Sequence, residues 1–126
     1  MTIVIDASAL LALLFDEPGG EAVLPLVRGA LLSAVNLDEV LHKCTRRGID
    51  ATAVLDSVRR LEVIVIPFDA EQALVSATLH ARAQAWRLSF ADRACLALGN
   101  MQGATIVTAD RAWQAFDGDA DIRLIR

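Results

Sequence analysis

The 126 residues are enough for one domain with a substantial core, which we place over residues 1–126. The net charge of −4 argues against a simple nucleic-acid coat protein. Hydrophobic residues make up 55% of the chain, but the longest apolar run, 7–15, is too short to span a membrane. No secretory pattern is visible, so we expect a cytoplasmic protein without membrane contacts.

Apolar runs alternate with helical patterns along the chain, as is typical of an α/β fold with a parallel sheet covered on both faces. In the first half of the chain we expect, in order, a strand at 2–6, helices at 7–14 and 21–28, a strand at 31–34, and helices at 36–47 and 51–61. In the second half we expect a strand at 62–66, helices at 69–86 and 89–99, a strand at 104–109, a short helix holding Trp113 and Phe116, and an edge strand at 122–125. Asn36 is predicted to cap its helix, and Gln72 stands at the capping-box position after Asp69.

Four acidic residues fall where such a sheet brings segments together. Asp6 and Asp110 each end an apolar strand, whereas Glu39 and Asp92 each lie in the first turn of a predicted helix. In open parallel sheets, ligand sites form beyond the carboxyl ends of the strands, where helices begin. We therefore expect the four carboxylates to share one pocket.

Crowded carboxylates repel each other unless a cation joins them. Carboxylate oxygens are hard ligands that suit Mg²⁺ or Mn²⁺. A metal held in this way can activate water for phosphodiester hydrolysis. The pattern therefore indicates a metal-dependent hydrolytic site.

Helix capping is the ordinary alternative for each acid. Asp6 and Asp110 can cap the helices that follow them, and Glu39 and Asp92 stand at capping-box positions after Asn36 and Ser89. Capping does not require acids from different strands and helices to meet at the same sheet edge, whereas a metal site does. Both interpretations remain open at this point.

Other polar residues are weaker candidates for chemistry. His42 and His80 stand on different predicted helices, and Cys44 and Cys95 lack metal-ligand spacing, so we expect structural roles and no disulfide. Ser8 has no His–Asp relay that would make it a nucleophile. Eleven of the twelve cationic residues are arginine, which grips phosphate in a fork, although codon preference explains this equally well.

Four segments in order resemble the motifs of PIN-domain proteins, especially the VapC-type toxins of bacterial toxin–antitoxin pairs. They are residues 4–10 (VIDASAL), 33–40 (SAVNLDEV), 88–98 (LSFADRACLAL) and 108–113 (TADRAW). The likeness covers essentially the whole chain.

The resemblance implies a three-layer α/β/α domain and a Mg²⁺- or Mn²⁺-dependent endoribonuclease, the toxin of a type II pair. It makes Asp6, Glu39, Asp92 and Asp110 the catalytic, metal-binding acids, supported through hydrogen bonds by Ser8 and Thr108. It also implies a homodimer held inactive by a small VapB-like antitoxin. Arg93 either contacts RNA phosphate or neutralises the acids when metal is absent.

The first predicted helix is apolar nearly all round, so one face needs shelter beyond the sheet. With Leu24 and Val27 of the next helix, Leu11 and Leu14 are predicted to form a groove for an antitoxin helix. Complete burial inside the domain is the alternative.

Two rival functions remain. An aspartate-based phosphotransfer domain would use Asp6 as its acceptor, although the second acid of one such class is replaced here by Ser8. A non-catalytic binding module would keep the acids as helix caps and bind no divalent metal.

Overall fold

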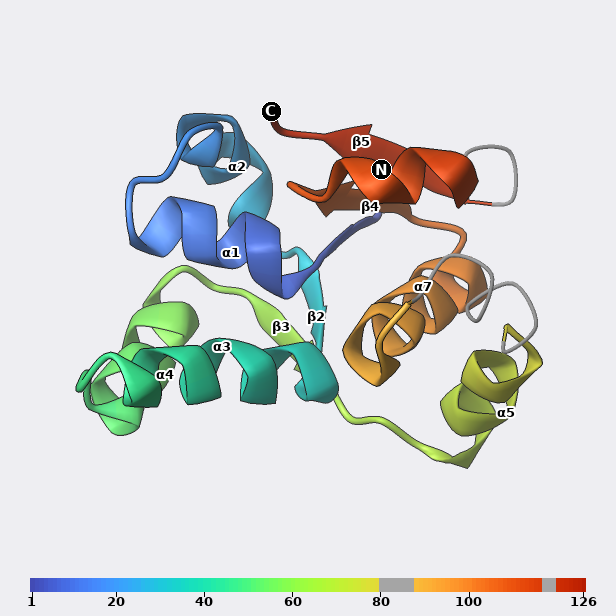
Figure 1. Cartoon of the computed structure of the whole chain (residues 1–126), viewed down its shortest axis with the longest axis horizontal. Coiled ribbons are helices and arrows are strands. Elements are labelled where there is room, and N and C mark those ends of the chain that lie inside the picture. Colours follow the sequence, from blue (N-terminus) through green and yellow to red (C-terminus); the bar gives the residue numbers. More distant parts are fainter. Residues whose placement is uncertain (80–87, 117–119) are drawn as a thin grey trace.

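A parallel sheet runs through the centre of the computed structural model, which describes residues 1–79, 88–116 and 120–126 (Figure 1). Its strands are β1 (Ile3–Ile5), β2 (Leu31–Ser33), β3 (Ile64–Ile66), β4 (Thr105–Thr108) and β5 (Asp121–Leu124). They lie in the order β3-β2-β1-β4-β5, and every neighbouring pair is parallel. The predicted parallel sheet is confirmed, with the last strand at one edge as expected.

The connections between strands are helical. The helices are α1 (Ala7–Leu14), α2 (Gly20–Val27), α3 (Ala34–Arg46), α4 (Ala51–Arg60), α5 (Ala70–Thr78), α7 (Phe90–Gln102) and the 3₁₀ helix η1 (Arg111–Phe116). Asp69 caps α5 as predicted. The helix expected over 69–86 is shorter than predicted, because α5 ends at Thr78 and Leu79 is its C-cap. Residues 80–86, with His80 and Trp86, lie outside the described residues. None of the described helices is long and apolar enough to cross a membrane.

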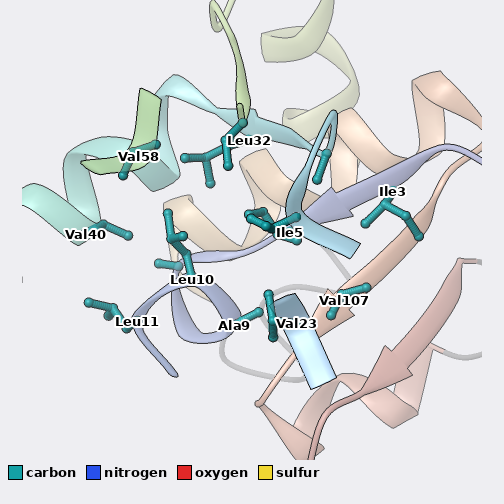
Figure 2. Packing of buried hydrophobic residues seen from close by; sticks show 14 of the residues in the cluster. Ile3, Ile5, Ala9, Leu10, Leu11, Val23, Leu32, Val40, Val58 and Val107 are labelled. Atoms are coloured by element: carbon teal, nitrogen blue, oxygen red, sulfur yellow. The ribbon is translucent and has the colours of Figure 1, made fainter. Parts of the chain in front are cut away.

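Alternating residues of the strands face two separate hydrophobic clusters. Ile3 and Ile5 of β1 pack with residues of α1 to α4, whereas Val4 between them packs with residues of α7 and with Trp113 of η1. Figure 2 shows the first cluster, in which Leu10 of α1 lies among side chains of the sheet and of the flanking helices. Because both faces of the sheet are covered, the expected three-layer α/β/α arrangement is confirmed.

The start of α3 differs from the prediction. Ser33 is the N-cap, since its Oγ accepts a hydrogen bond from Val35 N at 3.2 Å, and the helix begins at Ala34. Asn36 is therefore inside the helix and buried, with 1% of its surface exposed. The prediction that Asn36 caps this helix, and that Glu39 completes its capping box, is wrong because the strand and the cap share Ser33.

Two other boundaries move for local reasons. The third strand begins at Ile64 instead of residue 62, because Glu62 has a φ of 61° and turns the chain while pairing with Arg28. Helix α7 continues past Gly99 to Gln102 and ends at Gly103, whose φ is 58°. A Cβ on Gly99 would lie 2.3 Å from Ile106 Cδ1, so this glycine permits close packing of α7 on the sheet.

Candidate active site

The carboxyl ends of three neighbouring strands bring the predicted acids to one edge. Strands β1 and β4 pair directly, so Asp6 and Asp110 follow adjacent strands. Helix α3, which carries Glu39, begins immediately after β2 on the other side of β1. Helix α7, which carries Asp92, contacts β1, β2, β4 and α3. The four acids thus come from four segments that meet at this edge of the sheet.

Asp6 is buried at the end of β1, with 5% of its surface exposed. Its Oδ1 accepts a 2.9 Å hydrogen bond from Ala9 N, so the side chain caps α1. The Ser8 hydroxyl lies 2.7 Å from Oδ1 and 2.9 Å from Oδ2, and Thr108 Oγ1 donates to Oδ2 at 2.6 Å. Both carboxylate oxygens are therefore held in place by the surrounding chain.

The hydroxyl groups of Ser8 and Thr108 connect this carboxylate to the neighbouring strand. Ser8 Oγ accepts a 2.9 Å hydrogen bond from Ala109 N, and Thr108 Oγ1 accepts a 3.0 Å bond from Asp110 N. Each hydroxyl thus serves Asp6 on one side and the backbone leading to Asp110 on the other. This network couples the positions of two acids that are far apart in sequence.

Asp92 belongs to the capping box at the start of α7. Its backbone N donates to Ser89 Oγ at 3.1 Å, and its Oδ2 accepts from Ser89 N at 3.2 Å. The capping box expected at this position is present. One oxygen of Asp92 is consequently engaged by the backbone of its own helix.

Asp110 and Glu39 are also engaged locally. Asp110 Oδ1 accepts a 3.0 Å hydrogen bond from Ala112 N in the first turn of η1. Glu39 Oε2 lies 3.4 Å from Lys43 Nζ, one turn further along α3. The capping interpretation therefore accounts for local contacts of three acids, although it leaves their convergence unexplained.

The acids influence one another electrostatically. Burial raises the pKa of Asp6 to about 6, although hydrogen bonds from Thr108, Ala9 and Ser8 lower it; the charge of Asp92 raises it further. Burial also raises the pKa of Asp92 against the hydrogen bonds with Ser89, and the charges of Glu39 and Asp110 add to the rise. A cation at this edge would relieve the repulsion.

The chemistry of the donor set fits a hard divalent cation, because every predicted ligand offers carboxylate oxygens. In residues 1–79, 88–116 and 120–126, however, no three side chains of His, Cys, Asp or Glu are already gathered as a cation site. Here Asp92 contacts Ser89 and Glu39 contacts Lys43, each through one of its two carboxylate oxygens.

Arg93 does not contact the acids. Its Nη1 lies 3.4 Å from both the backbone O and the Oγ of Ser76, and its guanidinium lies 5.7 Å from the Phe90 ring centroid. The side chain therefore links α7 to α5. Neither of the two roles predicted for Arg93 is supported by these contacts.

Asn36 is a residue of the site that the sequence interpretation misplaced. Its Nδ2 donates a 3.0 Å hydrogen bond to Ala91 O, immediately before Asp92, while its Oδ1 is buried without a partner. The bond ties the helix of Glu39 to the start of the helix of Asp92. The spacing of Asn36 and Glu39, three residues apart on one helix face, was the available signal.

The two cysteines are free and buried, as expected for small apolar side chains. Cys95 lies behind the acids: burial raises the pKa of its thiol, and the charges of Asp6, Asp92 and Glu39 raise it further. His42 is exposed on α3, and His80 lies outside the described residues. Among the described residues, Cys44, Cys95 and His42 form no gathered metal-binding group with the acids.

Comparison with protein families gives one match that spans most of the chain. The model described as "PIN domain" matches residues 3–119. No curated protein matches the chain.

Solved structures share the fold at low sequence identity. A toxin–antitoxin complex from Klebsiella pneumoniae is 15% identical, with 99% of this chain and 98% of that chain covered and a TM-score of 0.78. VapC20 from Mycobacterium tuberculosis, described as a sarcin-ricin loop cleaving toxin, is 20% identical over 92% and 95%, with a TM-score of 0.77. DNA-bound VapBC from Salmonella typhimurium is 14% identical over 100% and 99%, with a TM-score of 0.75.

Proposed function

This chain belongs to the PIN-domain family, and we propose that it is a Mg²⁺- or Mn²⁺-dependent endoribonuclease that acts as the toxin of a VapBC-type pair. Its reaction is the hydrolysis of RNA phosphodiester bonds at the acidic edge of the sheet. The carrying observation is the buried Asp6 carboxylate, held by Ser8 and Thr108 and coupled by charge to Asp92. Capping a helix does not require burial, whereas burial of this carboxylate disfavours its charged form and so costs free energy at neutral pH.

Asp6, Glu39, Asp92 and Asp110 are the residues that would hold the metal. The bound ion would supply an activated water and offset charge on the attacked phosphate. The chain contributes orientation: Ser8 and Thr108 fix the oxygens of Asp6, and the same hydroxyls set the backbone before Asp110.

Asp92 and Glu39 would contribute by changing partners. Asp92 would exchange its bond from Ser89 N, and Glu39 its contact with Lys43, for the cation. Both contacts are single and partly exposed, so exchanging them for a divalent cation costs little.

A VapB-like antitoxin and a second copy of this chain are the proposed protein partners. Several structures that share the fold are complexes with antitoxins by their own descriptions. Of the four residues predicted to line a groove between α1 and α2, Leu11 and Val27 are buried in the core, and Leu14 is partly buried against it. Leu24, which is 57% exposed, remains as an anchor for a partner helix. The proposed location is the cytoplasm.

The phosphotransfer alternative is less well supported. An acceptor carboxylate must be reached by a phosphoryl donor, but Asp6 is 5% exposed and both of its oxygens accept hydrogen bonds. The binding-module alternative is supported by the capping contacts, and it predicts no metal-dependent chemistry.

RNA cleavage in Mn²⁺, in Mg²⁺ and in EDTA separates these functions. We expect cleavage only with metal, and Asp6→Asn or Asp92→Asn should lower the rate at least about 100-fold, or roughly 2.7 kcal/mol of barrier. Asp38→Asn is the matched control, because it removes an exposed carboxylate next to Glu39. Near-normal cleavage by folded Asp6→Asn and Asp92→Asn proteins would refute the assignment.

A further inference from the structure

A cluster of cations stands at the far end of the helix that carries Glu39. Lys43, Arg46 and Arg47 line an open hollow of about 290 Å³, here called the basic hollow. This is a local concentration of positive charge on a protein whose net charge is −4. Such a surface attracts a polyanion even when the whole molecule is acidic.

The basic hollow is connected to the acidic edge by α3 itself. Arg46 follows Glu39 by seven residues, or about 10 Å along a helix axis. Lys43 lies between them and reaches back to Glu39 Oε2 at 3.4 Å. Helix α1 runs beside α3 in the same direction, and both begin at the carboxyl ends of their strands (Figure 1). A line of cations therefore leads away from the acids.

The two arginines are available to an anion. Within the described parts of the chain, neither Arg46 nor Arg47 forms an ion pair with a carboxylate. The Arg47 guanidinium lies 4.7 Å from the centroid of the ring of Phe15, the C-cap residue of α1. A guanidinium held in this way keeps its donor fork for phosphate oxygens.

Favourable interaction with the helix dipole is the simpler explanation for cations at a helix end. It applies equally to α4, which ends in Arg59 and Arg60. The two helix ends differ in position. The end of α4 leads into the amino end of β3, whereas the acids lie at the carboxyl ends of the parallel strands. Only the α3 cations continue a path from the acidic edge.

We propose that the basic hollow binds backbone phosphates of single-stranded RNA that extends from the acidic site along α3. The inference rests on the proposed nuclease function and adds a substrate-binding surface to it. The cations lie along one helix and so can follow one backbone, whereas a duplex presents two. Lys43 faces the phosphate nearer the acids, and Arg46 and Arg47 face the phosphates beyond it.

Binding of a labelled ten-nucleotide oligouridylate to the purified chain, measured in EDTA over a range of salt, tests the proposal without cleavage. The variant Arg46→Gln/Arg47→Gln should bind about 10-fold more weakly at low salt. The slope of log affinity against log salt should fall in magnitude by about 1.4, or 0.7 for each lost phosphate contact. Arg46→Lys/Arg47→Lys should keep most of the slope. Arg59→Gln/Arg60→Gln, with the same change in net charge, should keep both affinity and slope.

Equal weakening by the two Gln pairs, an unchanged slope in Arg46→Gln/Arg47→Gln, or no salt-dependent binding by the unmodified chain would overturn the proposal. It would also fail if this variant kept its RNA affinity but lost affinity for a polyglutamate peptide, since the hollow would then receive an acidic protein segment. Thermal melting verifies that each variant is folded. Salt-dependent binding without any metal-dependent cleavage would overturn the nuclease function and leave the phosphate surface standing.

Discussion

Thr108 Oγ1 donates a 2.6 Å hydrogen bond to Asp6 Oδ2, which joins residues 102 positions apart at the ends of adjacent strands. The same oxygen accepts from Asp110 N at 3.0 Å. One hydroxyl thus positions the carboxylate of one acid and the backbone of another. Because all three groups are at one sheet edge, the contact ties the fold to the geometry of the proposed site.

Replacing Thr108 with valine keeps the side-chain shape and removes this hydroxyl. Asp6 then loses a hydrogen bond that lowers its pKa, so the pKa should rise further. We expect the free energy of unfolding at pH 7.5 to fall by about 1.5–3 kcal/mol, the usual range for a hydrogen bond to a charged group. The loss should be smaller at pH 5, where the Asp6 carboxyl is mostly protonated. Urea denaturation in EDTA at both pH values measures it.

Thr105→Val is the control on the same strand, because Thr105 Oγ1 donates to Asp121 at 2.5 Å on the edge strand and not to Asp6. The loss in free energy of unfolding caused by Thr105→Val should change little between pH 5 and pH 7.5. An equal cost of Thr108→Val at pH 5 and pH 7.5 would contradict the prediction.

The raised pKa of Asp6 makes stability depend on pH. Its folded-state value of about 6 lies above the ordinary 3.8, so between these values the folded protein binds more protons than the unfolded chain. Stability from this group is therefore fully present below pH 4 and is lost as pH rises through about 6. Asp6→Asn removes the dependence, and the variant should gain roughly 2–3 kcal/mol relative to the unmodified protein between pH 4 and pH 7 without metal.

Asp50→Asn is the control for this measurement. Asp50 also caps a helix, α4, but its side chain is exposed. The stability difference between Asp50→Asn and the unmodified protein should be nearly flat over the same range. A flat difference for Asp6→Asn as well would show that burial of Asp6 carries no such cost.

The sequence predicted the layers because continuous apolar runs, which indicate strands buried on both faces, alternate with helical patterns. Val4 and its neighbours Ile3 and Ile5 pack on opposite faces of the sheet, as a buried parallel strand requires. The sequence alone could not predict the capping residue of α3, since Ser33 and Asn36 are both good caps and the choice depends on where β2 ends. Nor could it predict the orientation of Arg93, which depends on the packing of α5 against α7.

The proposed site was predictable only as a set of segments. Strand ends and helix starts placed Asp6, Glu39, Asp92 and Asp110 at one edge. The contacts that fix the helices of these acids relative to one another were not predictable. The bond from Asn36 on the helix of Glu39 to Ala91 on the helix of Asp92, for example, joins residues 55 positions apart. Such contacts follow from how the helices pack on the sheet and leave no local pattern.

Asn36→Ala should separate positioning from stability. Loss of the bond to Ala91 O should cost about 1–3 kcal/mol of stability and should also loosen α3 relative to α7. If Glu39 and Asp92 share a cation, the dissociation constant for Mn²⁺ should rise about 10-fold, as is typical when a group behind the ligands is removed. Isothermal titration with Mn²⁺, together with urea denaturation, measures both effects.

Gln72→Ala is the matched control for Asn36→Ala. Gln72 is a buried amide whose Nε2 donates to Pro67 O at 2.8 Å, a bond within the segment that leads from β3 into α5 and not between α3 and α7. The Gln72→Ala protein should lose a free energy of unfolding similar to that lost by Asn36→Ala, without any change in Mn²⁺ affinity. Parallel changes in both variants would mean that Asn36 acts only on the fold.

Asp92→Asn distinguishes a metal ligand from a helix cap. Burial and the charges of Glu39 and Asp110 disfavour the Asp92 carboxylate, so the amide should leave the metal-free melting temperature unchanged or raise it. The unmodified protein should gain about 2.7 kcal/mol in Mn²⁺ at a hundred times its dissociation constant, and Asp92→Asn should lose most of this gain. Asp56→Asn, which removes an exposed carboxylate on α4, should keep this gain in stability.

If Asp92 acts only through its capping box with Ser89, the Asp92→Asn substitution should instead cost about 0.3–1 kcal/mol of stability. Mn²⁺ should then shift the melting temperature of neither the unmodified protein nor Asp92→Asn. Thermal melting of the three proteins in EDTA and in millimolar Mn²⁺ therefore decides between the two roles.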